Sequence, residues 1–566
     1  MQKQNHNSAQ FSPTPIESRE SGQIMVSLLL MLTLFLLAII GFAVDFTNLW
    51  FHRQAAQTAA DSACQAGASD MYLAIYNASS GLSAPNMGFT VGTSGDCSTN
   101  AGVGSICFYA NANGYNGAGL SSGVSNSVAW TFPASVNGVT APPTSITSDP
   151  FLKVTVTENV KTYFLSTLRG TAYQKVSASC TCGLLQEPKA APVMVLNPNA
   201  SGAFSLTGGG RLSIVGGPQR GLLVNSNSST AISCSPSGII DTSLGGPSDK
   251  GSDVAVAGGP TSAPTTCYGG GFKGGSTGSW YGSVLPIVDP YAGVAAPTSV
   301  KSIVPTSGLN GTSVQKAQSM SVAGQDGCPD TKNPCIEFSP GYYPNGITTG
   351  NYQTYIFLPG IYYMGGSLTA GHSATVRMAT PCTPSCSPLS SNVGQQTDGL
   401  MFYFSSGSIN LSGCSGCASS SIIPVPSTAL TCDGSTPNSG LGMPSSIDGN
   451  VLIAQCTANG TYWDTGGDTT DLRGNPGSRG ILIYQAHDNT ASVSYGGSGS
   501  LAFSGSLYLH STSYSDVLNI SGGASSGTYI LGQIVADEIN LSGSGAINLA
   551  LNPAKSTELL KIAMLQ

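Results

Sequence analysis

An uninterrupted apolar stretch near the N-terminus is the strongest pattern in this chain. Residues 24–44 are 21 consecutive positions without a charged side chain, and only Ser27 and Thr33 among them are polar. At about 1.5 Å of rise per residue, a helix of this length reaches roughly 30 Å, the thickness of the hydrocarbon core of a bilayer. The pattern predicts a membrane-spanning helix with these anchor positions: Ile24, Leu28, Leu32, Leu36, Ile40 and Val44.

A cleaved signal peptide is the competing interpretation of this stretch. Its apolar region would cover about 7–15 residues and end at a small-residue cleavage site. Here the apolar run is longer, and Asp45 begins a second helical pattern instead of a cleavage site. We therefore expect a retained single-pass anchor, preceded by a disordered cytosolic tail over residues 1–21.

The segment after the span favours a continuing helix. Residues 45–68 contain seven Ala, no Pro and a single Gly, Gly67. Ala favours helix, and a Gly near the end of the pattern predicts a stop there. We expect the span and an Ala-rich stalk to occupy residues 22–69, with small side chains that allow close approach of another helix, including that of a second copy.

Beyond the stalk the pattern becomes strand-like. Residues 70–190 combine a segment rich in Gly and Ser with strand, helix and strand patterns, which predict a small α/β module. Over 191–552 short alternating runs recur and end in Ser-Gly or Gly-Gly, as in 407–413, 516–523 and 538–551. Such alternation buries one side of each strand, and Gly accommodates the corners.

The predicted fold class is mostly β, with a right-handed β-helix-like solenoid as the main domain. Repeated runs in this architecture stack on their neighbours, but the spacing here is irregular, so a β-sandwich is the alternative. Residues 237–285 and 320–350 are expected to leave the stack as loops, and residues 553–566 to form a C-terminal tail.

Composition argues against one class of partner. Charged residues make up 8% of the chain, compared with about a quarter in typical proteins. The net charge of −7 is spread thinly, without a basic patch. Clustered Lys and Arg supply most of the affinity for nucleic acids, so nucleic-acid binding is not expected.

The 15 cysteines are expected to form disulfides, because the anchor places the body in an oxidising compartment. A zinc site made by Cys382, Cys386, Cys414 and Cys417 is the alternative. Cys64, on the stalk, is either free or links two copies. The candidates are Cys97 and Cys107, which would close a loop, then Cys180, Cys182, Cys328, Cys335, Cys382, Cys386, Cys414 and Cys417.

A family resemblance appears in the first 70 residues. This block resembles the N-terminal segment of the TadE/TadG-like proteins of the Tad (Flp) pilus-assembly system. Several phrases in the β-rich region, including 288–293 and 358–366, are similar to those of β-rich Tad-associated extracytoplasmic proteins. The matching pieces at the N-terminus are Gly22-Gln23, Ala43-Val44-Asp45, Trp50 to Arg53 and Gln57 to Ala68.

The resemblance implies an envelope protein with its N-terminus inside and its body outside the cytoplasmic membrane. In one respect the sequence departs from it. Processed pseudopilins of this system resemble type IV prepilins, which carry Glu five residues after the cleavage-site Gly. Ser27 stands at that distance from Gly22, so processing is not implied.

No catalytic motif is recognisable, so we expect neither an enzyme nor a cofactor. The stretch with Asp464, Asp468 and Asp471 is a weak candidate for Ca²⁺, and a solvated loop is the simpler interpretation. His487 and His510 stand near predicted strands and are interpreted as ordinary histidines rather than bases.

The leading hypothesis is a membrane-anchored, non-enzymatic envelope protein of the Tad type, acting as scaffold or adhesin. Its expected partners are the membrane, pilus-assembly or envelope proteins, and glycans. One alternative is a polysaccharide-active or glycan-binding β-helix protein, in which the three Asp residues above would converge with another acid. Another is an adhesin module unrelated to pili.

Overall fold

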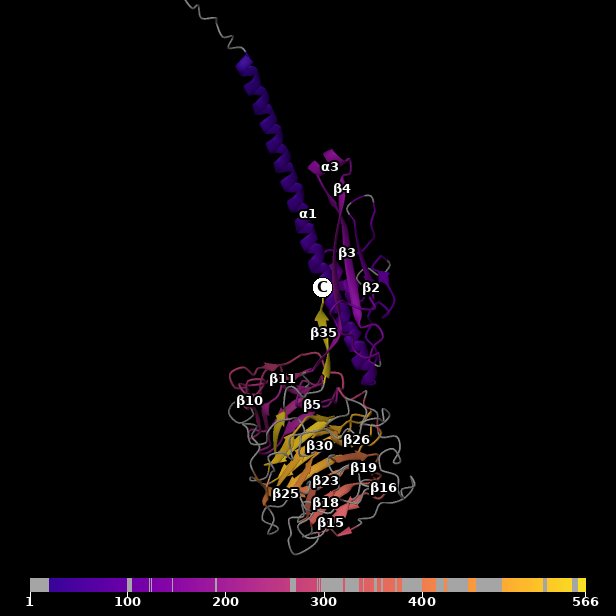
Figure 1. Ribbon diagram of the computed structural model, residues 1–566, viewed down its shortest axis with the longest axis vertical. Helices are drawn as coiled ribbons and strands as arrows, with labels where there is room; N and C mark the ends of the chain where they lie inside the picture. The colour runs from indigo at the N-terminus through magenta and orange to yellow at the C-terminus, as the bar shows by residue number, and fades with distance from the viewer. Residues whose placement is uncertain are drawn as a thin grey trace, which may run out of the picture.

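The computed structural model describes residues 20–98, 104–264, 271–296, 319–320, 335–378, 400–413, 422–424, 446–454, 481–551 and 558–565, apart from short gaps at 122, 124, 145, 189–190, 293, 295, 339–340, 351–353, 358–359, 372–373 and 523–526. Three parts follow one another along the long axis: a helix that extends alone, a stalk where this helix lies beside strands, and a body of stacked strands (Figure 1).

α1 (Glu20–Ser79) is one continuous helix of 60 residues that joins the apolar stretch to the stalk. The expected stop at Gly67 is wrong, because the helix continues for about three more turns. A Cβ at Gly67 would lie 2.5 Å from Leu152 Cδ2 and 2.8 Å from Ile106 Cγ1. Gly67 therefore permits close packing within the stalk and does not end the helix.

The stalk sheet is antiparallel, with the strand order β1-β2-β3-β4-β35. It packs on the Ala-rich side of α1, where Ala56, Ala59 and Ala63 are fully buried. The protein's own sheet thus covers the face that was expected to receive another helix. The elements of the stalk besides α1 are β1 (Gly95–Asp96), α2 (Ser105–Ala112), β2 (Asn126–Thr131), β3 (Phe151–Lys161), α3 (Phe164–Arg169), β4 (Tyr173–Pro188) and β35 (Glu558–Met564).

The end of the chain returns to the stalk. β35 pairs with β4 from Glu558↔Pro188 to Met564↔Cys182. The expected C-terminal tail is therefore wrong for Glu558–Met564, because alternate apolar residues of this strand, Leu560 among them, join the stalk core. Since β4 and β35 are neighbours in one sheet, the entire body between them is an insertion into the stalk.

The body consists of three large sheets, named here sheets 1, 2 and 3. Sheet 1 has ten strands: β5 (Val193–Val195), β8 (Arg220–Val224), β11 (Asp253–Val256), β13 (Trp280–Tyr281), β16 (Gly341–Tyr343), β19 (Gly360–Met364), β22 (Leu400–Phe404), β26 (Ile481–Gln485), β29 (Ser506–Leu509) and β32 (Ile534–Ala536). Sheet 2 has eight: β6 (Phe204–Leu206), β9 (Ile232–Cys234), β17 (Ile347–Thr348), β20 (Leu368–Ala370), β23 (Ile409–Gly413), β27 (Val493–Gly497), β30 (Val517–Gly522) and β33 (Glu538–Gly543).

Sheet 3 has twelve strands: β7 (Arg211–Gly216), β10 (Ile239–Gly245), β12 (Phe272–Lys273), β14 (Ser319–Met320), β15 (Ile336–Phe338), β18 (Thr354–Phe357), β21 (Thr375–Met378), β24 (Ile422–Pro424), β25 (Ser446–Ala454), β28 (Ser500–Ser504), β31 (Thr528–Leu531) and β34 (Ala546–Leu551). The stretches expected to loop out of the stack in fact supply strands to it. β10 to β13 come from 237–285, and β15 to β17 come from 320–350.

Over most of the body the chain visits the three sheets in the same order. β5, β6 and β7 lie in sheets 1, 2 and 3, and the same succession recurs from β16 to β34, with β24 as an extra strand beside β25. Among the described strands of the body, pairing is parallel except at β14–β15 and β24–β25. A β-sandwich consists of antiparallel sheets, so this pairing does not match the sandwich alternative.

The first and last strands of the insertion pair with each other in the middle of the stack. β32, β33 and β34 pair in parallel with β5, β6 and β7, for example Ile534↔Val193 and Ile539↔Phe204. From β5 the chain advances to β13 at one end of sheet 1, and it resumes from β16 at the other end. In Figure 1, β11 accordingly lies beside the stalk and β16 far from it.

The central strands of sheet 1 are buried on both faces, whereas sheet 2 is buried on one. Val193 and Val195 face the common core of the three sheets, and Met194 between them faces a second apolar cluster. Residues 284–292, named here the strap, contribute Ile287 and Tyr291 to that second cluster. In sheet 2, by contrast, buried and partly exposed residues alternate along β30 and β33.

Candidate functional site: the membrane exit and the stalk–body junction

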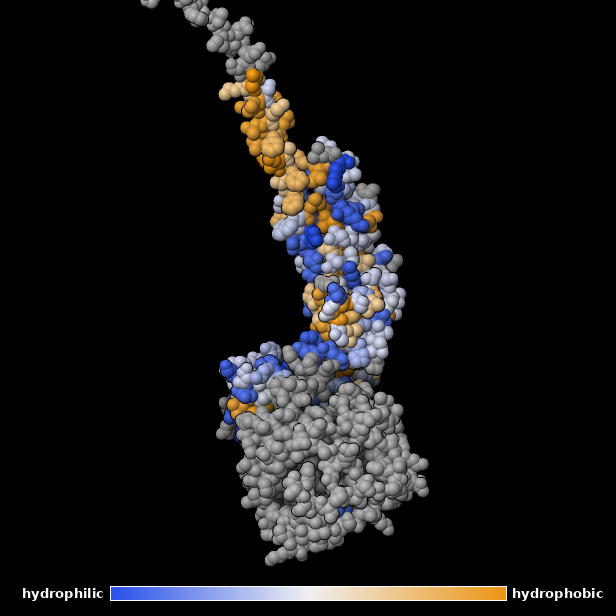
Figure 2. Space-filling view, viewed as in Figure 1, coloured by the Kyte–Doolittle hydropathy of each residue, from blue (hydrophilic) through white to orange (hydrophobic). Residues whose placement is uncertain are grey.

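The large side chains of the apolar part of α1 are exposed, and only Gly41 within it is buried. The surface of this part is hydrophobic along the length shown in Figure 2, and by length and composition the helix can cross a membrane. Exposure of so much apolar surface to water would be unfavourable, so a lipid environment accounts for it. The predicted anchor side chains are all exposed: Ile24, Leu28, Leu32, Leu36, Ile40 and Val44.

Asp45, the first residue after the apolar stretch, caps the N-terminus of α3. Its Oδ1 accepts the backbone N–H of Tyr163 at 2.9 Å, and its Oδ2 accepts those of Phe164 at 2.8 Å and Leu165 at 2.6 Å. Such N–H groups at a helix start have no partner within the helix. The buried Asp45 carboxylate thereby holds the β3–β4 tip, with α3, against the membrane-exit end of α1.

A disulfide joins the stalk helix to its sheet. Cys64 of α1 bonds to Cys182 of β4, which excludes a free Cys64 or a link between two copies through it. Cys180 was expected to be a disulfide partner; it is a buried free thiol instead, because Cys64 bonds to its neighbour Cys182. Burial, followed by the nearby Asp61 carboxylate, raises the pKa of Cys180 to about 12, which makes the thiol unreactive.

Other cysteines divide between the described and undescribed parts of the chain. Cys97 bonds to Cys107, the pair expected to close a loop. Cys335 is disulfide-bonded, as is Cys234. The remaining candidates lie outside the described residues: Cys328, Cys382, Cys386, Cys414 and Cys417.

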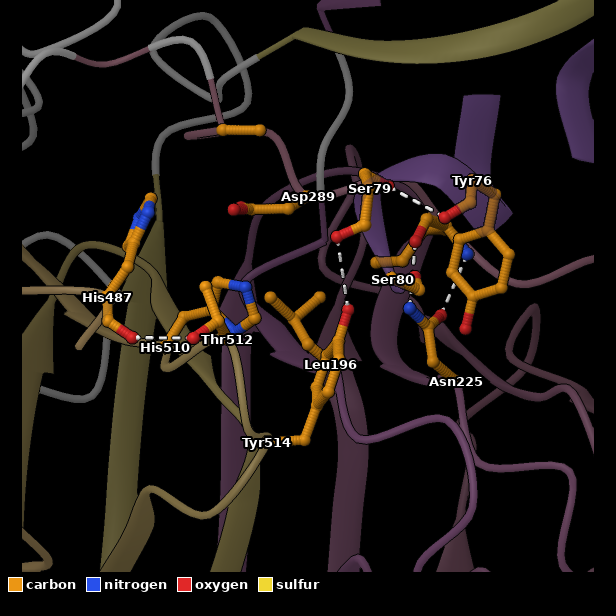
Figure 3. A pocket seen from close by; sticks show the side chains of 12 residues that line it. Tyr76, Ser79, Ser80, Leu196, Asn225, Asp289, His487, His510, Thr512 and Tyr514 are labelled. Carbon is orange, nitrogen blue, oxygen red and sulfur yellow. Dashed lines mark hydrogen bonds between the residues drawn. The ribbon is translucent and has the colours of Figure 1, made fainter. Parts of the chain in front are cut away.

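A cavity of about 200 Å³ lies where the C-terminal end of α1 meets the body. Figure 3 shows that side chains from the helix end, the strap and the loops that follow strands of sheet 1 surround it. Its lining therefore unites segments that are far apart in the sequence: Tyr76, Ser79, Ser80, Leu196, Asn225, Ile287, Asp289, Ala292, His487, His510, Thr512 and Tyr514.

One hydrogen-bonded chain at this cavity ties the strap to sheet 1. The Tyr508 hydroxyl donates to Asp289 Oδ2 at 2.6 Å, and it lies 2.8 Å from His487 Nε2. Since that hydroxyl donates to Asp289, its oxygen accepts from Nε2–H of His487. Burial, followed by the charge of nearby His510, lowers the pKa of His487, which favours its neutral form.

A second group of titratable residues is centred on Asp537. His510 Nδ1 is 2.6 Å from Asp537 Oδ1, and Asp537 Oδ2 accepts the backbone N–H groups of Ser511 and Asp516. Burial alone would lower the pKa of His510, but the bond to Asp537 and the surrounding acids raise it. Asp537 is fully buried and acts as the acceptor that organises the loop after β29.

Asp516 is the least satisfied group at the junction. It is buried, and neither carboxylate oxygen has a hydrogen-bond partner among the described residues. Burial, followed by the negative charge of Asp537, raises the pKa of Asp516 to about 8. Asp516 and His510 thus both have raised pKa values, and Asp537 accepts the hydrogen bonds that hold the loop.

The N-terminal segment has a recognisable family. Residues 22–70 match the family described as putative Flp pilus-assembly TadE/G-like. The chain carries a TadE/G-like domain. No curated protein and no solved structure matches the chain.

The TadE/G-like domain includes the membrane anchor, the Asp45 cap and Cys64 of the disulfide. It ends within α1, which continues to Ser79 at the junction cavity. The family match thus covers the helix that supports the body but not the body itself. By length and composition, the helix that carries the match can cross a membrane.

Sequence reasoning found some junction residues but not their arrangement. His487 and His510 were singled out as ordinary histidines, whereas Asp289, Asp516 and Asp537 carried no recognisable spacing. Their positions depend on parallel neighbours such as β29 and β32, which bring Leu509 opposite Ala536. The Ca²⁺ candidates Asp464, Asp468 and Asp471 lie outside the described residues.

Proposed function

We propose that this protein is a single-pass component of a Tad/Flp pilus-assembly system that holds a non-catalytic β-rich scaffold outside the cytoplasmic membrane. The observation that carries the proposal is the continuity of α1 from the exposed apolar stretch to the stalk–body junction. One unbroken helix, joined to its sheet by Cys64–Cys182, links the anchor to the body. The body is thereby held at a defined distance from the bilayer.

Within this proposal the three sheets form a right-handed β-helix-like solenoid. Its support is the recurring order of sheets along the chain, the parallel pairing and a core to which all three sheets contribute. Crossover connections between parallel strands of one sheet are almost always right-handed, which supports the handedness. A scaffold of this kind presents long, regular flanks to partners.

The extracytoplasmic orientation is supported by the disulfides, because such bonds persist in oxidising compartments. Protease added to intact spheroplasts should digest the body and leave the membrane-spanning part of α1, with the N-terminal tail, protected. Alkylation before and after reduction should reveal the two described disulfides in protein taken directly from cells. A protected body with reduced thiols would contradict the orientation.

A non-catalytic role is supported by the hydrogen bonds of two of the junction acids. Asp537 is occupied by donors from its own loop, and Asp289 by the Tyr508 hydroxyl. These bonds hold the strap and loops in place. Substituting Asp289 by Asn should therefore alter stability and leave pilus assembly intact wherever the protein still folds.

The pilus-assembly context is tested by co-purification from membranes of cells that make the pilus. Full-length protein should enrich Tad secretion components. The matched control replaces residues 24–44 with an unrelated span of Leu and Ala, which preserves anchoring. If the control variant no longer enriches the Tad secretion components, these components contact the anchor. If the wild-type protein does not enrich them, the proposal is refuted.

Glycan binding is a second candidate, favoured by a row of uncharged polar side chains on the outer side of sheet 2. There Ser205 donates to Asn540 Oδ1 at 2.9 Å, and Asn540 Nδ2 lies 3.3 Å from Asn519 Oδ1. Such a row of partly exposed hydroxyl and amide groups offers donors and acceptors to sugar hydroxyls. Binding to a glycan array that Asn519→Arg abolishes would support this role, and no binding would exclude it for the sugars tested.

A further inference from the structure

We propose that the β3–β4 tip, residues 161–175, is a second membrane contact that lies at the boundary between lipid headgroups and acyl chains on the body side. This inference rests on the proposed membrane anchoring. It adds a contact made by a segment more than one hundred residues away from the span in sequence.

The depth of the tip follows from its contact with α1. A Cβ at Gly41 would lie 2.4 Å from ring atoms of Phe164, so this ring packs directly over Gly41. Gly41 precedes Val44, the end of the apolar stretch, by three residues, or about 4.5 Å along a helix. When the apolar stretch spans the bilayer, Phe164 therefore lies level with the last turn inside it.

The tip exposes aromatic side chains at this depth. Tyr163 is 60% exposed and Phe164 remains 49% exposed despite its contact with α1. On α1 itself, Phe42 and Phe46 stack on each other and are also exposed. Aromatic side chains concentrate at membrane interfaces, where their amphipathic rings reach the headgroups. In Figure 2 hydrophobic surface adjoins the helix at the top of the stalk, where this tip lies.

Backbone N–H groups of the tip have hydrogen-bond partners within the protein. Asp45 accepts the three N–H groups of Tyr163, Phe164 and Leu165. At the other side of α3, Gly170 N–H donates to Ser166 O at 2.8 Å. Polar backbone groups that enter an apolar environment without partners are costly, so these bonds lower the cost of placing the tip in the interface.

The charges around the tip suit a lipid surface. Lys161, Arg169 and Lys175 are exposed, and no Asp or Glu occurs in residues 159–186. Lys161 Nζ lies 5.5 Å from the centre of the Tyr163 ring. Long basic side chains can cover apolar surface while their charged ends reach lipid phosphates. Apolar rings surrounded by cations thus favour anionic lipid over a transmembrane helix of another protein as the occupant.

Photocrosslinking in the full-length protein tests this contact. p-Benzoylphenylalanine replaces Phe164, and separately Tyr163, in protein reconstituted into vesicles of phosphatidylcholine and phosphatidylglycerol. Phe108 on α2 is the matched control, because it is 54% exposed and its helix packs beside Gly67. Gly67 lies 23 residues beyond Val44, about 35 Å farther along α1.

We expect at least a fivefold higher yield of lipid adducts at positions 163 and 164 than at 108, measured by mass spectrometry. D45N in the Tyr163 variant should lower that yield without releasing the protein from vesicles. Equal yields at the three positions in protein that resists carbonate extraction would overturn the tip contact and leave the anchor intact. Release of the protein by carbonate would refute the anchor itself. Adducts mainly to protein in native membranes would identify a protein partner and overturn the lipid assignment.

Discussion

The stalk and the body bury their apolar side chains in different ways. In the stalk, one helix covers one face of a five-stranded antiparallel sheet, and Cys64–Cys182 joins the two layers. In the body, parallel strands of three sheets face a shared core, and most strands have a neighbour on each side. Stability in the stalk thus depends on a few contacts between distant segments. In the body it is distributed over many similar ones, and single substitutions should reveal this difference.

Removing the stalk disulfide should have the largest effect. The bond closes 118 residues, and loss of its constraint on the unfolded chain costs about 5 kcal/mol by the loop-entropy relation. Cys64→Ser together with Cys182→Ser should lower the unfolding temperature of the stalk and leave hydrogen exchange in β26 to β34 unchanged. Hydrogen-exchange mass spectrometry on the full chain measures both regions.

The matched control is Cys97→Ser with Cys107→Ser. This bond closes only ten residues, so the same relation gives about 3 kcal/mol. If loss of the shorter bond proves the more damaging, or if the body loosens together with the stalk, the two regions do not differ as described.

Within the body, releasing the strap should have a smaller and local effect. The buried Asn225 side chain donates to Ile287 O at 2.8 Å and accepts Ile287 N–H at 2.7 Å. Asn225→Ala leaves both backbone groups unpaired, at a cost of about 3 kcal/mol. Exchange should rise in residues 284–292 and stay low in the stalk. Asn519→Ala, on the partly exposed side of sheet 2, is the control and should cost less than about 1 kcal/mol.

At the membrane end of the stalk, loss of a helix cap is the next effect in size. Asp45→Ala removes the acceptor of three backbone N–H groups and should destabilise α3 by about 2 kcal/mol. Exchange of the amides of residues 163–165 should increase while that of β2 remains slow. Unchanged protection at these three amides would show that the cap contributes little.

Taken per pH unit and per group, the smallest effect is a dependence of body stability on pH. The pKa of Asp516 is raised to about 8 from an ordinary 3.8, and that of His510 is raised above 6.5. The folded state therefore binds more protons than the unfolded state between about pH 4 and 8 for Asp516, and above pH 6.5 for His510. Stability should fall as pH rises through these ranges, by at most about 1.4 kcal/mol per pH unit for each group.

Asp516→Asn tests this origin directly. The variant cannot take up the proton at position 516, so urea unfolding between pH 5 and 6.5 should show a flatter pH dependence than the wild-type body. An identical slope in the two proteins would place the proton uptake elsewhere.

Local patterns predicted part of the architecture. The 21-residue apolar run, the Ala-rich continuation and the alternating runs at 407–413, 516–523 and 538–551 became α1, β23, β30, β33 and β34. Each pattern reflects burial on one face of a single element, which neighbouring residues encode. Gly67 shows the limit of such reasoning, because its role depends on Leu152 and Ile106.

The sequence by itself determined the membrane-capable helix, the TadE/G-like segment and the mostly β character of the body, because periodicity and composition are properties of contiguous residues. Only the tertiary structure decided that Cys64 pairs with Cys182, that β35 returns to β4 and that β34 pairs with β7. Those pairings join residues up to several hundred positions apart. They depend on register and on competition among many similar strands, which no local pattern encodes.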